Sequence, residues 1–135
     1  MIRRVYLLWH SFVMNELHTI GTLTETENKN YIFKFDEDAL KAEEDGCFLP
    51  FKYTTEPLFF NKLPAFFDQR MLKSQFNIET FGIKYSPEKE MEILAFGDAI
   101  RNHDNFRVVT ERTYKVLKEE LIDKKRENPV PNKKI

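Results

Sequence analysis

Few residues of this chain are of a type that carries out chemistry, and their spacing matches no catalytic or metal-binding motif. The histidines are His10, His18 and His103, and Cys47 is the single cysteine. No two histidines have the spacing of a zinc-binding helix, and no second cysteine accompanies Cys47. We therefore expect no metal and no cofactor, and we expect each histidine to be a surface or hydrogen-bonded residue.

Other constellations are equally incomplete. A hydrolase that uses Cys47 or His103 remains an alternative, but the sequence does not bring these residues together, and a free cysteine is commonly a buried apolar residue. The acidic clusters Asp36–Asp38 and Glu43–Asp45 are typical of a solvated surface. Four scattered glycines form no phosphate-binding loop: Gly21, Gly46, Gly82 and Gly97. The sequence thus predicts a protein that catalyses nothing itself.

Composition limits the location and the partners. The chain has 135 residues, 41% of them apolar and 32% charged, as in a soluble single domain. The net charge of -1 produces no overall field toward phosphate backbones or anionic lipid. Residues 1–14 lack the pattern of a signal peptide, and no stretch approaches the roughly 20 apolar residues that span a bilayer. With one cysteine and no internal disulfide, we expect a cytoplasmic protein without membrane contact.

The first part of the chain predicts an antiparallel meander. Val5–Trp9 is an apolar run typical of a buried strand, His18–Leu23 alternates, and Tyr31–Phe35 places its aromatic rings on one face. The polar segment Glu25–Asn30 predicts the hairpin connection between the last two. Phe106–Val109 predicts a final strand.

Helices are predicted between and after these strands. Asp36–Glu44 favours helix, with Asp36 as its cap and Gly46 as its end. Leu63–Met71 has an amphipathic spacing with Pro64 in its first turn, and Pro57 predicts a turn before it. Ser86–Phe96 has a cap at Ser86, proline at the first helical position and a glycine stop. Glu111–Arg126 predicts a C-terminal helix.

These elements predict an α+β fold, in which a small antiparallel sheet packs with two main helices and carries a C-terminal helix. We expect one domain over residues 1–127 and a flexible tail over residues 128–135.

Two sets of residues are candidates for binding. The aromatic-rich centre of the chain, residues 48–67, predicts a docking surface for a protein partner, with Tyr53, Phe59 and Phe60 as its candidate contacts. Basic residues among aromatic ones in the C-terminal half are the alternative, because such a mixture binds nucleic acid. Those residues are Lys73, Lys84, Arg101 and Arg107. The balanced net charge makes nucleic acid the less favoured partner.

The order of several short segments resembles the N-terminal subdomain of HipA kinases. These are Leu23–Thr24 after Gly21, Tyr31–Asp36, Phe48–Phe51, and Leu63–Asp68 with its Phe–Phe pair. The chain also resembles the segment that precedes HIRAN domains in some bacterial proteins, through Val5–Trp9, Gly21–Leu23, Leu63–Met71, Ile93–Ala95 and Asp104–Val108. Together the resemblances cover about residues 5–110.

The resemblance implies a binding function. HipA kinases carry their catalytic residues in later domains, so a separate copy of the N-terminal subdomain is similar to HipS, the small component of HipBST toxin–antitoxin systems, which binds and blocks a HipA/HipT-type kinase. A tryptophan is implicated in HipS, but Trp9 lies elsewhere and does not inherit that role. The helix end Asp68–Met71 also departs from the family's pattern. The HIRAN-related resemblance implies a nucleic-acid-associated module as the alternative.

Overall fold

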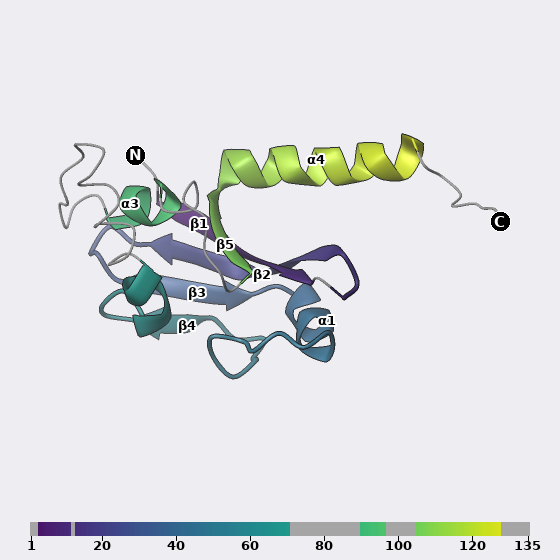
Figure 1. Ribbon diagram of the computed structural model, residues 1–135. Coiled ribbons are helices and arrows are strands. Elements are labelled where there is room, and N and C mark those ends of the chain that lie inside the picture. The colour runs from purple at the N-terminus through teal and green to yellow at the C-terminus, as the bar shows by residue number, and fades with distance from the viewer. Residues whose placement is uncertain (1–2, 12, 71–89, 97–104, 128–135) are drawn as a thin grey trace.

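A five-stranded antiparallel sheet forms the centre of the protein. The computed structural model describes residues 3–11, 13–70, 90–96 and 105–127. The strands are β1 (Arg4–Ser11), β2 (Glu16–Glu25), β3 (Tyr31–Phe35), β4 (Leu58–Phe60) and β5 (Phe106–Thr110). Their order across the sheet is β4-β3-β2-β1-β5 (Figure 1). This arrangement confirms the predicted α+β fold and its meander.

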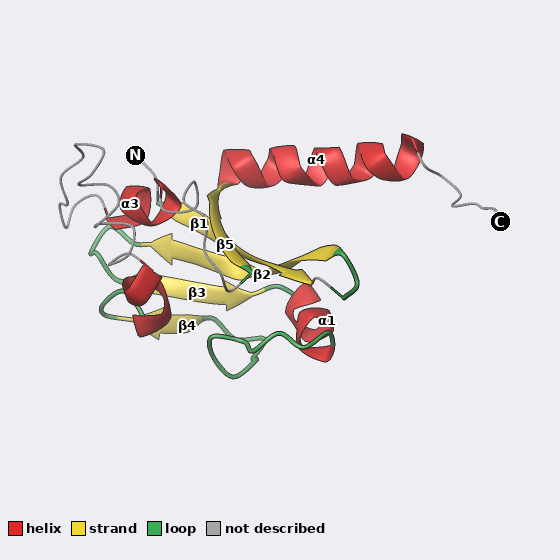
Figure 2. Cartoon of the chain, viewed as in Figure 1, coloured by secondary structure: helices red, strands yellow, loops and turns green. Residues whose placement is uncertain are grey.

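Helices lie on both faces of the sheet (Figure 2). On the core face, helical residues 65–70 bury Phe67, and α3 (Glu90–Phe96) buries Met91 and Leu94. Helix α1 (Asp38–Glu44) packs beside β2. Helix α4 (Glu111–Glu127) begins directly after β5 and covers part of the opposite face before it extends beyond the sheet (Figure 1). None of the described helices has the length and apolarity needed to cross a membrane.

The core is mostly aromatic because large rings from the strands and loops meet on one face of the sheet. Phe33 is fully buried, and its ring centroid lies 5.0 Å from that of Phe35, 5.2 Å from that of Phe51 and 5.9 Å from that of Phe67. The first two pairs are edge-to-face and the third is tilted, and such ring packing adds to the stabilisation from burial alone. Most phenylalanines of the centre of the chain thus serve the core.

An irregularity in the β1–β2 pair decides which residues of β2 face the core. Leu7 pairs with Gly21, but the next residue, Leu8, pairs with Thr19, so Ile20 is an extra residue in β2. Such a bulge shifts every later residue by one position. As a result, His18 and not Thr19 lies opposite Trp9, on the core face of the sheet.

Helix α1 ends as the sequence predicts, but it begins at Asp38, with Glu37 at the N-cap position and no side-chain cap hydrogen bond. The Asp36 carboxylate accepts a hydrogen bond from the Asp38 backbone N–H at 2.9 Å, just before the first helical turn. Gly46 adopts a φ of 104°, and the N–H groups of Gly46 and Cys47 donate to the carbonyls of Glu43 and Ala42. This is a Schellman motif, which fixes the backbone around the C-terminal end of α1.

Some sequence predictions differ from the structure. Strand β2 spans Glu16–Glu25, beyond the predicted His18–Leu23, because its pairing with β1 and β3 extends it at both ends. Leu58–Phe60 forms strand β4, where we expected a turn after Pro57; three residues are too few for an alternating pattern, and the strand forms because it pairs with Tyr31–Phe33. The helix predicted from Leu63 begins at residue 65. Met71, Ser86 and residues 128–135, which belong to the predicted helices and the predicted tail, lie outside the described residues.

Candidate functional site

The three aromatic residues predicted to contact a partner have different environments. Tyr53 is half-buried, with its ring 5.3 Å from that of Phe35, and Phe60 is half-buried, with its ring 5.1 Å from that of Phe51. Both pack against the core. Phe59 is 73% exposed. Of the three, Phe59 is the most exposed to solvent.

Phe59 lies at an edge of the sheet. It belongs to β4, the last strand in the sheet order, and pairs with Ile32 of β3. Its neighbours Leu58 and Phe60 pack against the core, so Phe59 points to the opposite face. Helix α4 contacts β1 and β5 at the far side of that face.

Of the four basic residues, the structure describes Arg107 alone. Arg107 is half-buried in β5 and pairs with Leu8 of β1. Lys73, Lys84 and Arg101 lie outside the described residues. The structure therefore does not show whether the four basic residues lie close together.

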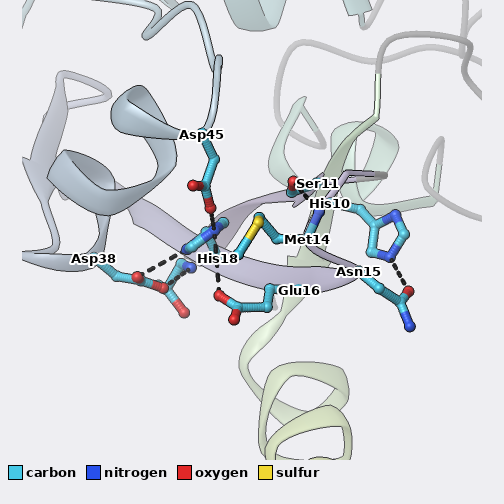
Figure 3. Close-up of polar contacts among 9 residues, drawn as sticks. His10, Ser11, Met14, Asn15, Glu16, His18, Asp38 and Asp45 are labelled. Atoms are coloured by element: carbon cyan, nitrogen blue, oxygen red, sulfur yellow. Dashed lines mark hydrogen bonds and ion pairs between the residues drawn. The ribbon is translucent and has the colours of Figure 1, made fainter.

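A polar cluster that the sequence analysis did not predict surrounds His18 (Figure 3). The ring nitrogen Nδ1 lies 2.9 Å from Asp38 Oδ1, and Nε2 lies 2.8 Å from Asp45 Oδ2 and 3.8 Å from Glu16 Oε2. His18 itself is only 2% exposed. We call Glu16, His18, Asp38 and Asp45 the His18 cluster.

Each member of the His18 cluster is positioned by a local feature of the backbone. The bulge at Ile20 turns His18 inward, and Glu16, two residues earlier on the same strand, points to the same face. Asp38 begins α1, and its second oxygen accepts a hydrogen bond from the Thr19 backbone N–H at 2.8 Å. Asp45 is the last residue before the Gly46 turn. The cluster therefore ties both ends of α1 to β2.

The carboxylates favour a charged imidazole. Burial lowers the pKa of His18, but hydrogen bonds to Asp38 and Asp45 and the attraction of their charges outweigh burial, so the pKa is raised above the ordinary 6.5. With a carboxylate at each ring nitrogen, the doubly protonated ring donates to both. Trp9 stacks beside the ring at a centroid distance of 6.0 Å.

The His18 cluster corrects one reading of the sequence. We expected the acidic clusters to be solvated surface, and this is wrong for Asp38 and Asp45, whose carboxylates bond to His18. The Glu-x-His spacing of Glu16 and His18 places both side chains on one face of a strand, but the predicted strand began at His18 and did not include Glu16. The two aspartates were not visible as partners, because they lie 20 and 27 residues away in the sequence.

Three atoms of this cluster are suitable metal ligands. They come from Glu16, His18 and Asp45, and all lie within 4.8 Å of one another. Imidazole nitrogen with carboxylate oxygen is a ligand set that suits zinc and similar ions.

Cys47, the other candidate of the sequence analysis, is buried between α1 and the core. Burial, together with the charge of Glu43, raises the pKa of its thiol to about 12. At neutral pH the thiol stays protonated, and the thiolate is the reactive form. His103 lies outside the described residues.

The state of Cys47 can be measured with a thiol reagent. In the folded protein at pH 8 we expect labelling to be slower than in urea-unfolded protein by a factor that follows the free energy of unfolding. The absorbance change of a chromogenic disulfide reagent, followed by stopped-flow or manual mixing, gives the labelling rates of the native and the unfolded protein. Labelling of the native protein at the rate of a free thiol would contradict the burial of Cys47.

No known protein family, curated protein or solved structure matches this chain.

Proposed function

We propose that this protein is a non-catalytic interaction module, similar to HipS, that binds and regulates a separate HipA/HipT-type kinase of a toxin–antitoxin or defence operon in the cytoplasm. The observation that carries the proposal is the exposure of Phe59 on the edge strand β4. A large aromatic side chain exposed to water in the free protein gains most when a partner covers it. The resemblance to the N-terminal subdomain of HipA kinases supports the choice of partner.

The position of Phe59 also suggests how the partner is bound. An edge strand offers backbone N–H and C=O groups to a further strand, and a side chain beside that edge adds specificity. Tyr53 and Phe60 support this surface from beneath, because each packs against a core ring. Phe59 is thus the direct contact, and the other two hold β4 and the preceding loop in place.

Co-purification tests the class of partner. The tagged protein is recovered from its native cell with and without nuclease, and the bound proteins are identified by mass spectrometry. A stoichiometric kinase-like protein that survives nuclease supports the proposal. Recovery of nuclease-sensitive material alone would instead favour the nucleic-acid-associated alternative. Of the four basic residues proposed for that alternative, the structure describes Arg107, which is half-buried.

Replacing Phe59 with alanine tests the surface. We expect binding to the recovered partner to weaken by about 2 kcal/mol, or roughly 30-fold in Kd, because the substitution removes a large ring from the interface. The stability of the free protein should stay nearly unchanged, since Phe59 is exposed. Calorimetry with the purified partner gives Kd, and urea denaturation gives stability.

Phe48 provides a matched control. It is 91% exposed but follows α1 and lies on no strand. Phe48→Ala removes the same ring from a different surface and should leave Kd unchanged. Equal losses for both variants, or no loss for Phe59→Ala, would argue against β4 as the contact surface.

A further inference from the structure

The ligand atoms of the His18 cluster converge beside one ring nitrogen. Asp45 Oδ2 lies 2.8 Å from His18 Nε2, and Glu16 Oε2 lies 3.8 Å from the same nitrogen on its other side (Figure 3). In a tetrahedral zinc site with ligands at about 2.0–2.1 Å, neighbouring ligand atoms stand about 3.3 Å apart. The two distances fall on either side of this value, and all three ligand atoms lie within 4.8 Å of one another. The Glu16 and Asp45 side chains would have to reorient around an ion bound to Nε2 to complete the geometry.

The other ring nitrogen is held as it is in many metal-binding histidines. Nδ1 faces Asp38 Oδ1 at 2.9 Å, and Asp38 Oδ2 accepts the Thr19 N–H at 2.8 Å. Both oxygens of Asp38 are therefore engaged, and the carboxylate fixes the orientation of the imidazole. A carboxylate on the far nitrogen is the usual partner of a histidine ligand, because it keeps the proton on Nδ1. Metal binding at Nε2 releases the proton that Nε2 donates to Asp45 in the metal-free protein.

One ligand of the cluster is buried and another is exposed, an arrangement that suits an ion entering from solvent. The His18 side chain is held in the fold, stacked beside Trp9, whereas the Glu16 side chain is 58% exposed. Glu16 can thus swing toward an arriving ion without disturbing the core. Asp45 is held near Nε2 by the backbone turn at Gly46.

We propose that Glu16, His18 and Asp45 bind one divalent transition-metal ion of the zinc type, and that Asp38 is the positioning residue that orients the His18 ring. The ion would join β2 to the C-terminal end of α1, and it would keep a fourth position for water or a partner's ligand. The mixed imidazole and carboxylate donors disfavour Mg²⁺ and Ca²⁺, which prefer oxygen ligands. This inference is independent of the proposed function.

Titration of the untagged full-length protein with Zn²⁺ tests the site. Isothermal titration calorimetry should show one ion per chain, and Mg²⁺ should give no comparable heat. Glu16→Gln and Asp45→Asn should each weaken Zn²⁺ binding by at least about tenfold, and Asp38→Asn by about 10- to 100-fold. Glu44→Gln is the control, because Glu44 is an exposed acid beside Asp45 and its loss changes the charge without removing a ligand.

A spectroscopic measurement identifies the atom that binds. In a long-range ¹H–¹⁵N NMR spectrum, the Nε2 resonance of His18 should move to the position of a metal-bound nitrogen while Nδ1 keeps its proton. Glu16 is exposed, so Glu16→Gln reports on affinity without loss of the fold. Absence of Zn²⁺ binding, binding that survives both Glu16→Gln and Asp45→Asn, or a shift at His10 in place of His18 would overturn the proposal.

Discussion

Replacing Gly21 with alanine is expected to destabilise the protein by about 3 kcal/mol, at the upper end of the usual cost of overpacking. A Cβ atom at this position would lie 2.5 Å from the backbone oxygen of Lys34 and 2.7 Å from Cζ of Phe33. The oxygen belongs to β3, which pairs with β2 at this point, and the Phe33 ring is enclosed by three other rings. Neither neighbour can move without loss elsewhere.

Urea denaturation followed by the fluorescence of Trp9 measures this cost. Gly46→Ala is a useful comparison, because a Cβ there meets nothing within 4 Å and only the positive φ opposes it. We expect Gly46→Ala to cost about 1–2 kcal/mol. A double variant, Gly21→Ala with Phe33→Leu, should show a smaller combined loss than the sum of the single losses, because the leucine relieves one of the two clashes. Strict additivity would mean that the Phe33 ring does not oppose the new methyl group. A cost below about 1 kcal/mol for Gly21→Ala would mean that β2 and β3 move apart easily.

Much of the sheet was predictable because its signals are local. The alternation of Tyr31–Phe35 predicts β3 with the bounds that the structure shows, and Phe106 opens β5 as expected. The stop at Gly46 was also predictable, because the Schellman motif uses only neighbouring residues. Strand β4 was not, since its three residues become a strand through pairing with β3 and not through a pattern of their own.

Local sequence patterns do not predict the His18 cluster. His18 faces inward only because the bulge at Ile20 shifts the register by one residue, and a bulge leaves no mark in the hydrophobic pattern. Asp38 and Asp45 reach the ring because α1 folds back onto β2, which depends on tertiary packing. From the sequence, acidic residues in and beside a short helix predict a solvent-exposed surface. Only the structure shows that the carboxylates of Asp38 and Asp45 point toward His18.

The exposure of Phe59 is another feature that the sequence does not predict. In the sequence, Phe59 and Phe60 are equivalent aromatic neighbours. The strand separates them, because successive side chains of a strand point to opposite faces. Phe60 packs against Phe51, and Phe59 faces water. The short strand β4, itself invisible to the pattern, therefore decides which aromatic residue is free to contact a partner.

Replacing His18 with leucine is expected to cost about 3 kcal/mol at pH 6 in the presence of EDTA. Leucine fills most of the space of the ring but donates no hydrogen bond, so both aspartates face an apolar group. Removing one partner of a buried ion pair typically costs about 3–5 kcal/mol. The value here falls at the lower end, because the Asp38 and Asp45 side chains are 30% and 22% exposed and water can partly solvate them.

The cost of His18→Leu should shrink as the pH rises. The folded protein holds the His18 proton with a raised pKa, whereas the unfolded chain releases it near 6.5. The stabilisation is therefore complete below about pH 6.5 and declines as the pH rises through the folded-state pKa, by at most about 1.4 kcal/mol per pH unit. A neutral ring has one N–H, so it can donate to only one of its two carboxylates.

Denaturation of the wild type and of His18→Leu at several pH values between 6 and 9 measures the difference directly, since changes at other groups cancel in the comparison. His10→Leu makes the same replacement at a half-buried histidine on β1, whose Nε2 lies 3.3 Å from Asn15 Oδ1, and it should show a smaller effect at every pH. A cost of His18→Leu that stays constant across this range would mean that His18 does not carry the charge. A cost that falls with pH would show that the protonated His18 ring, through its contacts with Asp38 and Asp45, adds to the stability of the packing between α1 and β2.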